Sequence, residues 1–422
     1  MAEGCQVADA EILVVGGGIV GLCCALALRR RGVEVTLLDP GRREGAASFG
    51  NAGHIATEQG APLASAAMLR SAPGRLTLAG GPIALPPGAV RHWLPFALRL
   101  ARAAAPARHA AGAAALGGLL DGAMPAWRRL VRDLARPDLL SEDGHWVVWH
   151  DPAAAARGLA AWRTAAIGTA RLREASPGER AHLGSVMARP PVAALKFDGT
   201  GQVADPGAVL DALERAFAAA GGRRQAGRLR ALEVADGRAV AVTEAGERLA
   251  PGRLLVAAGV ASGALLGPAG LRAPIIAERG YHIQAAEHGW PADLQPIVFE
   301  DRSTIATRFS GGLRVAGFVE FGRHDAAPDP RRWRALERHA GALGLPLRGA
   351  LTRWVGSRPT LPDYLPAIGR APGAGNLFYA FGHQHLGLTL APLTAELVAG
   401  LMGQDGGDPA LAAFSLRRFA RP

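Results

Sequence analysis

A glycine-rich turn near the start of the chain constrains the fold more than any other feature. Residues 16–21 read Gly-Gly-Gly-Ile-Val-Gly, which is the pattern GxGxxG. The apolar run at residues 11–15 predicts a buried strand before the turn, and residues 18–31 predict a helix after it. Residues 33–38 predict the next strand, and Asp39 stands directly behind them. This order is typical of a βαβ unit that opens a parallel sheet.

The same turn predicts a dinucleotide site. Gly16 permits a tight turn, Gly18 lets the backbone approach a pyrophosphate, and Gly21 lets the helix pack on the strand. The free N–H groups of the helix N-terminus attract phosphate. Asp39 can accept hydrogen bonds from ribose hydroxyls and would repel a 2′-phosphate, so NADP is disfavoured while NAD and FAD stay open. The binding residues predicted from this unit are Gly16, Gly18, Ile19, Val20, Gly21 and Asp39.

Composition argues against several kinds of partner. The net charge is +11, but Lys196 is the only lysine and the arginines are scattered along the chain. A nucleic-acid surface should show a clustered basic stripe and aromatic side chains on which bases can stack. The aromatic content is only 5%. We therefore expect no nucleic-acid partner. Cys5, Cys23 and Cys24 have neither disulfide nor zinc spacing, so we also expect no metal.

The sequence contains no clear targeting or membrane-spanning segment. Residues 1–10 are acidic and polar, unlike a signal peptide, and the low cysteine content fits a reducing cytoplasm. Beyond the fingerprint region, no uninterrupted apolar run reaches about 18 residues. The alanine-rich block at residues 89–134 predicts helices that either pack under a substrate lobe or touch a membrane surface. We expect a cytoplasmic protein, with peripheral contact at the inner face of the membrane as the variant.

Elements of the parallel type recur at the start, in the middle and near the end of the chain, whereas residues 279–321 predict an antiparallel sheet. We therefore expect an α/β fold, α+β overall. A Rossmann-like nucleotide domain would carry an inserted substrate domain, built on an antiparallel sheet plus helices. The expected division is residues 1–80, 200–270 and 355–422 for the nucleotide domain, and residues 81–199 and 271–354 for the substrate domain.

Three further segments carry a family resemblance. Residues 46–54 read AASFGNAGH, and residues 254–262 read LLVAAGVAS. RPTLPD at residues 358–363 leads through PAIG to GHQHLGLT at residues 382–389. Together with the fingerprint, these segments resemble the FAD-dependent D-amino-acid oxidase superfamily. The D-amino-acid dehydrogenases are the most similar branch, and glycine oxidase is more distant. The resemblance runs from residue 11 to about residue 419, and its middle part matches only in general character.

The resemblance implies FAD bound in an extended form. A cysteine link of the kind found late in some relatives is excluded, because no cysteine follows Cys24, so the flavin is expected to be non-covalent. The fingerprint would hold the ADP half of FAD. Residues 48–54 would run alongside the ribityl chain and the flavin, and residues 382–389 would cover the flavin ring. Beyond the fingerprint, the cofactor residues implied are Ser48, Asn51, Ala52, Gly53, Leu229, Ala257, Ala258, Gly259, Gly382, His383, Leu386, Gly387, Leu388 and Thr389.

The resemblance also implies a set of substrate residues. Arg358 aligns with the family arginine that clamps the substrate carboxylate, a task suited to a planar guanidinium. Tyr281 is the candidate second donor to that carboxylate. His282 and His54 either line the pocket or serve the structure.

Two positions depart from the family pattern. His385 stands where glycine oxidase has an arginine, so a second carboxylate contact is either lost or made pH-dependent. Tyr364 replaces a common family glycine, which predicts a different pocket rim.

The implied activity is oxidation of a D-amino acid to the imino acid, by hydride transfer to flavin N5. Water then releases a 2-oxo acid and ammonia, and the electrons pass to a quinone or another carrier. D-proline, 4-hydroxy-D-proline and sarcosine-type secondary amines are alternative substrates. Two other functions are a flavoprotein acting on modified tRNA and a non-catalytic subunit of a heteromeric amine dehydrogenase. The scattered arginines argue against the first, and the presence of Arg358 argues against the second.

Overall fold

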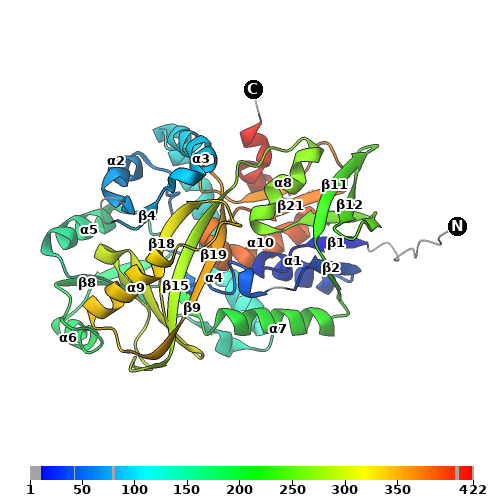
Figure 1. Cartoon of the computed structure of the whole chain (residues 1–422). Helices are drawn as coiled ribbons and strands as arrows, with labels where there is room; N and C mark the ends of the chain where they lie inside the picture. Colours follow the sequence, from blue (N-terminus) through cyan, green and yellow to red (C-terminus); the bar gives the residue numbers. More distant parts are fainter. Residues whose placement is uncertain (1–10, 42, 78–80, 404–407, 421–422) are drawn as a thin grey trace.

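A computed structural model of the chain describes residues 11–41, 43–77, 81–403 and 408–420. Figure 1 shows two regions side by side. The N-terminal βαβ unit belongs to one region, and a large, strongly twisted sheet dominates the other. This is the expected fold class: a Rossmann-like domain joined to a second domain that is built on a mainly antiparallel sheet.

A six-stranded sheet forms the core of the first region, in the order β10-β2-β1-β14-β21-β20. Neighbouring strands are parallel, except that β20 and β21 are antiparallel. Both faces are covered, so β1 is apolar and buried at every position. The strands are β1 (Ile12–Val15), β2 (Val35–Asp39), β10 (Arg223–Ala226), β14 (Arg253–Val256), β20 (Ala367–Arg370) and β21 (Leu377–Phe381).

Three helices cover one face of this sheet and share a hydrophobic core with it. They are α1 (Ile19–Arg30), α7 (Pro206–Ala219) and α10 (Gly387–Leu401). Cys23 and Cys24 on α1 are buried free thiols, and burial raises the pKa of both well above the ordinary value. They therefore pack as small apolar side chains in this core.

The second region is built on a nine-stranded sheet, in the order β19-β15-β18-β17-β16-β6-β8-β7, with β4 beside β18. The pairs are antiparallel except β16–β6 and β18–β4. Its strands are β4 (Ile83–Ala84), β6 (His145–Trp149), β7 (Arg171–Glu174), β8 (Ala193–Asp198), β15 (Ile276–His288), β16 (Ile297–Phe299), β17 (Thr304–Phe309), β18 (Gly312–Gly322) and β19 (Leu347–Thr360).

Several helices begin where the sequence places an acidic or hydroxyl residue before a proline. Asp151, Ser176, Asp205 and Asp329 each accept a hydrogen bond from a backbone N–H of the first turn, and proline follows each at the first helical position. The remaining helices are α2 (Ala66–Arg75), α3 (Val90–Ala103), α4 (Pro106–Asp133), α5 (Pro152–Thr164), α6 (Pro177–Gly184), α8 (Ser262–Leu266) and α9 (Pro330–Leu343).

Two small sheets complete the fold. One is β11 (Leu229–Ala235), β12 (Arg238–Thr243) and β13 (Arg248–Leu249), and the other is β3 (His54–Ile55), β5 (Leu140–Ser141) and β9 (Gly201–Val203). The domain boundary expected between residues 354 and 355 falls inside β19, so this strand contributes to both sides of that division. Among the described residues, no helix has the length and apolar character needed to cross a membrane.

Candidate active site

One large cavity, of about 1070 Å³, lies between the two regions. The carboxyl ends of β1, β2 and β14 open into it from one side, and β15, β18 and β19 border it from the other. Such a position is typical of ligand sites in open parallel sheets. The sequence-predicted residues on its wall are Gly16, Gly18, Ile19, Val20, Asp39, Ser48, Asn51, Ala52, His54, Leu229, Ala257, Ala258, Gly259, Tyr281, Arg358, His383, His385, Gly387 and Leu388.

The fingerprint glycines fill three different requirements. Gly16 has φ +110°, and a Cβ there would lie 2.5 Å from the Ala257 carbonyl oxygen. At Gly21 a Cβ would lie 1.8 Å from the Gly16 carbonyl oxygen. At Gly18, by contrast, a Cβ would meet only the Ser48 hydroxyl, at 3.4 Å. Gly16 and Gly21 thus keep the turn closed, while Gly18 leaves the N-terminus of α1 open to the cavity.

Asp39 fixes the same turn from the end of β2. Its Oδ2 accepts a hydrogen bond from the Gly17 N–H at 2.7 Å, and its Oδ1 accepts one from the Gly41 N–H at 2.8 Å. Arg224 lies 3.6 Å from the same carboxylate. The carboxylate therefore stands at the cavity rim with fixed orientation.

Six sequence-predicted residues lie behind the cavity wall rather than on it: Gly21, Gly53, His282, Gly382, Leu386 and Thr389. Thr389 accepts a hydrogen bond from the Ala56 N–H at 3.0 Å and so ties the start of α10 to the segment directly after β3 (His54–Ile55). The indole N–H of Trp127 on α4 donates to the carbonyls of Leu388 and Thr389, each at 3.2 Å. These residues are placed to support the segments that form the wall.

His282 has a similar supporting position. Its Nδ1 donates to the Gly50 carbonyl at 3.0 Å, and its ring stacks on Trp354 with centroids 5.0 Å apart. Burial, with the charge of Arg314, lowers the pKa of His282 to about 3. A neutral imidazole thus couples the large sheet to the loop that was predicted to pass the flavin.

Arg358 reaches the cavity with its guanidinium held by a buried carboxylate. Its side chain is 29% exposed, and Nη1 lies 3.3 Å from Oε1 of Glu278. The second oxygen of Glu278 accepts hydrogen bonds from the Thr360 hydroxyl at 3.0 Å and the Tyr364 hydroxyl at 3.2 Å. Sequence analysis did not single out Glu278. Its only signal was its place directly before residues 279–321, the segment that predicts the antiparallel sheet.

Tyr281 does not present a free hydroxyl to the cavity. Its O–H donates to Oε2 of Glu320 at 3.3 Å and accepts from the Asp329 N–H at 3.1 Å. Burial raises the pKa of Tyr281, so the phenol keeps its proton. Since that proton is used by Glu320, this geometry disfavours Tyr281 as a second donor to a substrate carboxylate.

His385 and His383 carry no positive charge at neutral pH. Burial lowers the pKa of each to about 4. His383 is hydrogen-bonded to the Thr394 hydroxyl at 3.0 Å, and Nε2 of His385 is hydrogen-bonded to Oε1 of Gln59. His385 therefore supplies no positive charge to the pocket at neutral pH, and a pH-dependent carboxylate contact through it would operate only in acid.

Strained backbone gathers around this cavity. Ser303, Phe318, Tyr364 and Gln384 have φ between +46° and +58°, although none of them is glycine, and all four line the cavity. Phe318 is also the extra residue of a β-bulge in β18, opposite Gly280 and Tyr281. Such strain and bulges are concentrated at functional sites. The φ of +55° at Tyr364 is one that glycine adopts without strain.

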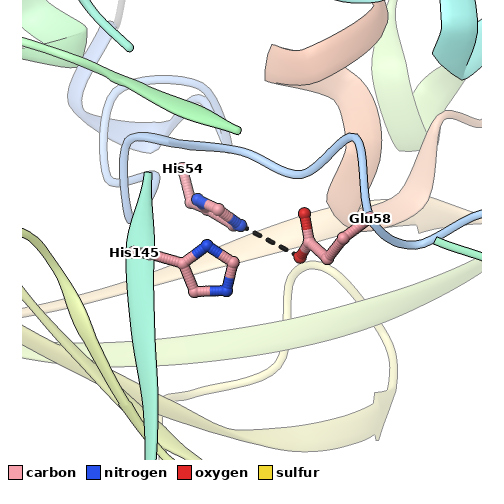
Figure 2. A group of neighbouring side chains, drawn as sticks. All are labelled: His54, Glu58 and His145. Atoms are coloured by element: carbon pink, nitrogen blue, oxygen red, sulfur yellow. Dashed lines mark hydrogen bonds and ion pairs between the residues drawn. The ribbon is translucent and has the colours of Figure 1, made fainter. Parts of the chain in front are cut away.

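Figure 2 shows a further group on the cavity wall, formed by His54, Glu58 and His145. Nε2 of His54 lies 3.1 Å from Oε1 of Glu58, and the rings of His54 and His145 are 4.4 Å apart. Burial alone would raise the pKa of Glu58, but His54 outweighs it and the pKa falls to about 2. Burial, with the charge of His54, lowers the pKa of His145 to about 3. Sequence reasoning missed Glu58 and His145.

Comparison with known proteins identifies the family. Residues 11–401 match the FAD dependent oxidoreductase family, DAO. The chain belongs to this family. It is 32% identical to "D-amino-acid oxidase" of Bradyrhizobium diazoefficiens, over 97% of this chain and 99% of that protein. It is 30% identical to "D-amino acid dehydrogenase 2" of Pseudomonas aeruginosa, over 93% and 95%. Among solved structures, glycine oxidase from Geobacillus kaustophilus shares the fold with a TM-score of 0.71 at 21% identity, covering 98% and 99% of the two chains.

The residues of this DAO-family oxidoreductase fit FAD. The turn at Gly16–Gly21 has no room for side chains at its closed end, and the α1 N-terminus, where the Ile19 N–H donates to the Ser48 hydroxyl at 3.0 Å, lines the cavity. Asp39 stands at the rim where a ribose would lie, and the cavity continues from this turn to Arg358. When bound, FAD supplies the two-electron acceptor, and the chain supplies the contacts that hold and orient it.

Proposed function

We propose that this FAD-dependent oxidoreductase is a D-amino-acid dehydrogenase. The names of its relatives at 30% and 32% identity support an amino-acid substrate of D configuration. The observation that carries the proposal is the position of Arg358, whose guanidinium is fixed by Glu278 and still reaches the cavity. A cation held in this way is suited to a carboxylate, which all amino acids share.

Each residue then has a stated task. Arg358 binds the substrate carboxylate, and Glu278 orients Arg358 and balances its charge. His385 is neutral, so the positive charge near Tyr364 comes from Arg358 and from Arg75, which also lines the cavity. Holding the carboxylate fixes the α-carbon relative to the cofactor cradle, and this orientation is the main contribution that the protein can make to an amine oxidation.

We further propose that the electrons pass to a quinone or another carrier at a membrane surface. Helix α3 supports this, because Phe96 and Leu100 face the cavity while Leu94 and Leu98 are 44% and 58% exposed. An exposed apolar stripe on a helix that also lines the cavity suits peripheral contact with a bilayer. Co-sedimentation with anionic vesicles, compared between the parent and Leu94→Gln/Leu98→Gln, would test this contact.

The decisive experiment is the absorbance spectrum of the FAD-loaded protein, recorded without oxygen before and after addition of single D- and L-amino acids and D-proline. We expect the oxidised flavin band to bleach with D-amino acids and to persist with their L-enantiomers. Fast recovery of the oxidised flavin band with a quinone, and slow recovery of that band with air, would identify a dehydrogenase. A band that no D-amino acid bleaches would overturn the proposal, and bleaching by D-proline alone would move it to secondary amines.

A further inference from the structure

The group formed by His54, Glu58 and His145 has two features that the amine chemistry does not use. One ligand atom from each residue lies within 4.8 Å of the others. Oε2 of Glu58 and Nδ1 of His54 are buried without a hydrogen-bond partner. Glu58 is 4% exposed, so an unpartnered oxygen on its carboxyl group is costly unless a ligand supplies a positive charge or a donor.

The surrounding strands hold the two histidines in fixed relation. His54 on β3 is opposite Gln202 on β9, and His145 on β6 is opposite Phe197 on β8. Strands β8 and β9 are consecutive and joined by a short turn, although they belong to different sheets, so this one connection sets the spacing between both histidines.

The imidazole of His145 is further fixed by direct contacts. It stacks on Phe197 at 4.8 Å, and its Nδ1 is hydrogen-bonded to the buried Thr200 hydroxyl at 2.9 Å. This contact leaves Nε2 available as a ligand atom. A hydrogen bond from the second ring nitrogen is how proteins orient metal-binding histidines.

We propose that His54, Glu58 and His145 form a binding site for one divalent transition-metal ion, with Zn²⁺ as the best match. Two imidazoles and one carboxylate are the donor set that suits zinc, whereas a hard cation such as Mg²⁺ prefers oxygen ligands alone. The site faces the cavity, so water can complete a tetrahedral shell.

The geometry requires only a small adjustment to bind such an ion. Ligand atoms that each lie about 2.1 Å from one ion in a tetrahedral shell are about 3.4 Å apart, so movements that close the group by up to about 1.4 Å are sufficient. The ion would replace the contact between His54 and Glu58 and would pair the oxygen of Glu58 that now has no partner. This site departs from the sequence-based expectation of no metal, because its ligands are brought together by folding.

The site also has a consequence for the cavity. Gln59 follows Glu58 directly and is hydrogen-bonded to His385, whose pKa responds to the charges of both Glu58 and Arg358. An ion at this place would add positive charge near His385, on which Arg358 also acts. We therefore expect Zn²⁺ to change the KM for the amine, a consequence that rests on the proposed function, whereas binding itself does not.

The test is calorimetric titration of Zn²⁺ and, separately, Mg²⁺ into the tag-free, FAD-loaded protein after chelator treatment. The chain has 12 histidines, so His182→Gln, at a half-exposed surface histidine next to Asp293, is the control for unspecific binding. We expect one Zn²⁺ per chain, no Mg²⁺ binding, and parental affinity in the control. Glu58→Gln and His54→Gln should each weaken Zn²⁺ binding by at least about 10-fold.

Folding of each variant is checked by its flavin content and metal-free melting temperature, and two variants are used so that failure of one to fold leaves the other informative. Replacement of Zn²⁺ by Co²⁺ gives a second readout, since tetrahedral Co²⁺ absorbs at longer wavelengths than oxidised flavin. Zn²⁺ affinity in the parent no greater than in a folded Glu58→Gln or His54→Gln protein would overturn the proposal. In that case the His54–Glu58 pair is a structural contact only.

Discussion

Glu278 on β15 and Arg358 on β19 stand directly opposite each other in the antiparallel register of the large sheet. The pairing places Oε1 of the carboxylate 3.3 Å from Nη1 of the guanidinium, with the carboxylate buried and the guanidinium at the cavity. Because both strands are long and continuous around this pair, the orientation of Arg358 is set by the sheet itself. On the proposed function, Arg358 binds the substrate and Glu278 positions Arg358.

Glu278→Gln should therefore raise the KM for the amino acid by about 10-fold while changing kcat much less, because one charge-assisted contact to Arg358 is weakened. Steady-state kinetics with a D-amino acid would check this split. Glu287→Gln is a matched control, since Glu287 is exposed and opposite Arg348 on the same two strands. Equal KM values in the Glu278→Gln protein and the parent would remove the positioning role.

Arg358→Ala should raise the KM for a carboxylated substrate by about 100-fold, the loss expected for a charge-assisted, two-point contact. Arg358→Lys should reverse only part of this rise in KM, because an ammonium lacks the planar fork of a guanidinium. Arg353→Ala serves as the control, because Arg353 on the same strand pairs with Glu337 at the surface. For an amine without a carboxylate, parent and Arg358→Ala should have the same KM; a 100-fold difference there would contradict the assignment.

The features of this molecule that the sequence predicts are those determined by residues close together in the chain. The fingerprint, its flanking strands and Asp39 fall within residues 11–39, so pattern and spacing contain the whole unit. Helices that begin at an acidic or hydroxyl residue before a proline are equally local. The division of domains at residue 354 was less well placed, because β19 is one continuous strand that passes through it.

The parts that sequence did not predict depend on pairing between distant strands. Glu278 is 80 residues from Arg358, and His145 is brought to His54 through the short turn that joins β8 to β9. Sequence also does not predict the direction of a side chain. Tyr281 is in the expected segment, next to a β-bulge, but its hydroxyl donates to the buried Glu320.

The fingerprint glycines should separate folding from cofactor binding. Gly21→Ala would place a Cβ 1.8 Å from a backbone oxygen and should lower the melting temperature or prevent folding. Gly18→Ala meets only a hydroxyl at 3.4 Å, so the protein should fold but bind FAD more weakly. Gly400→Ala in α10, with no neighbour within 4 Å of the new Cβ, is the control. Flavin fluorescence on dilution measures retention, and parental FAD affinity in Gly18→Ala would contradict the cradle.

Two buried histidines should make the protein sensitive to acid. Burial lowers the pKa of His282 to about 3 and that of His383 to about 4, from an ordinary value of 6.5. Below pH 6.5 the unfolded chain therefore binds more protons at these positions than the folded chain does, and the free energy of unfolding falls as the pH falls. At pH 5 the loss is at most about 2 kcal/mol for each histidine.

Melting temperatures measured between pH 7 and pH 5 would check this dependence. His383→Asn, which cannot titrate, should lose less stability across this interval than the parent, even if it is less stable at pH 7 because the contact with Thr394 changes. His182→Gln, on the surface, should keep the parental dependence. An unchanged pH dependence in His383→Asn would mean that His383 does not contribute to acid sensitivity, and a similar result for His282→Asn would place its origin elsewhere in the protein.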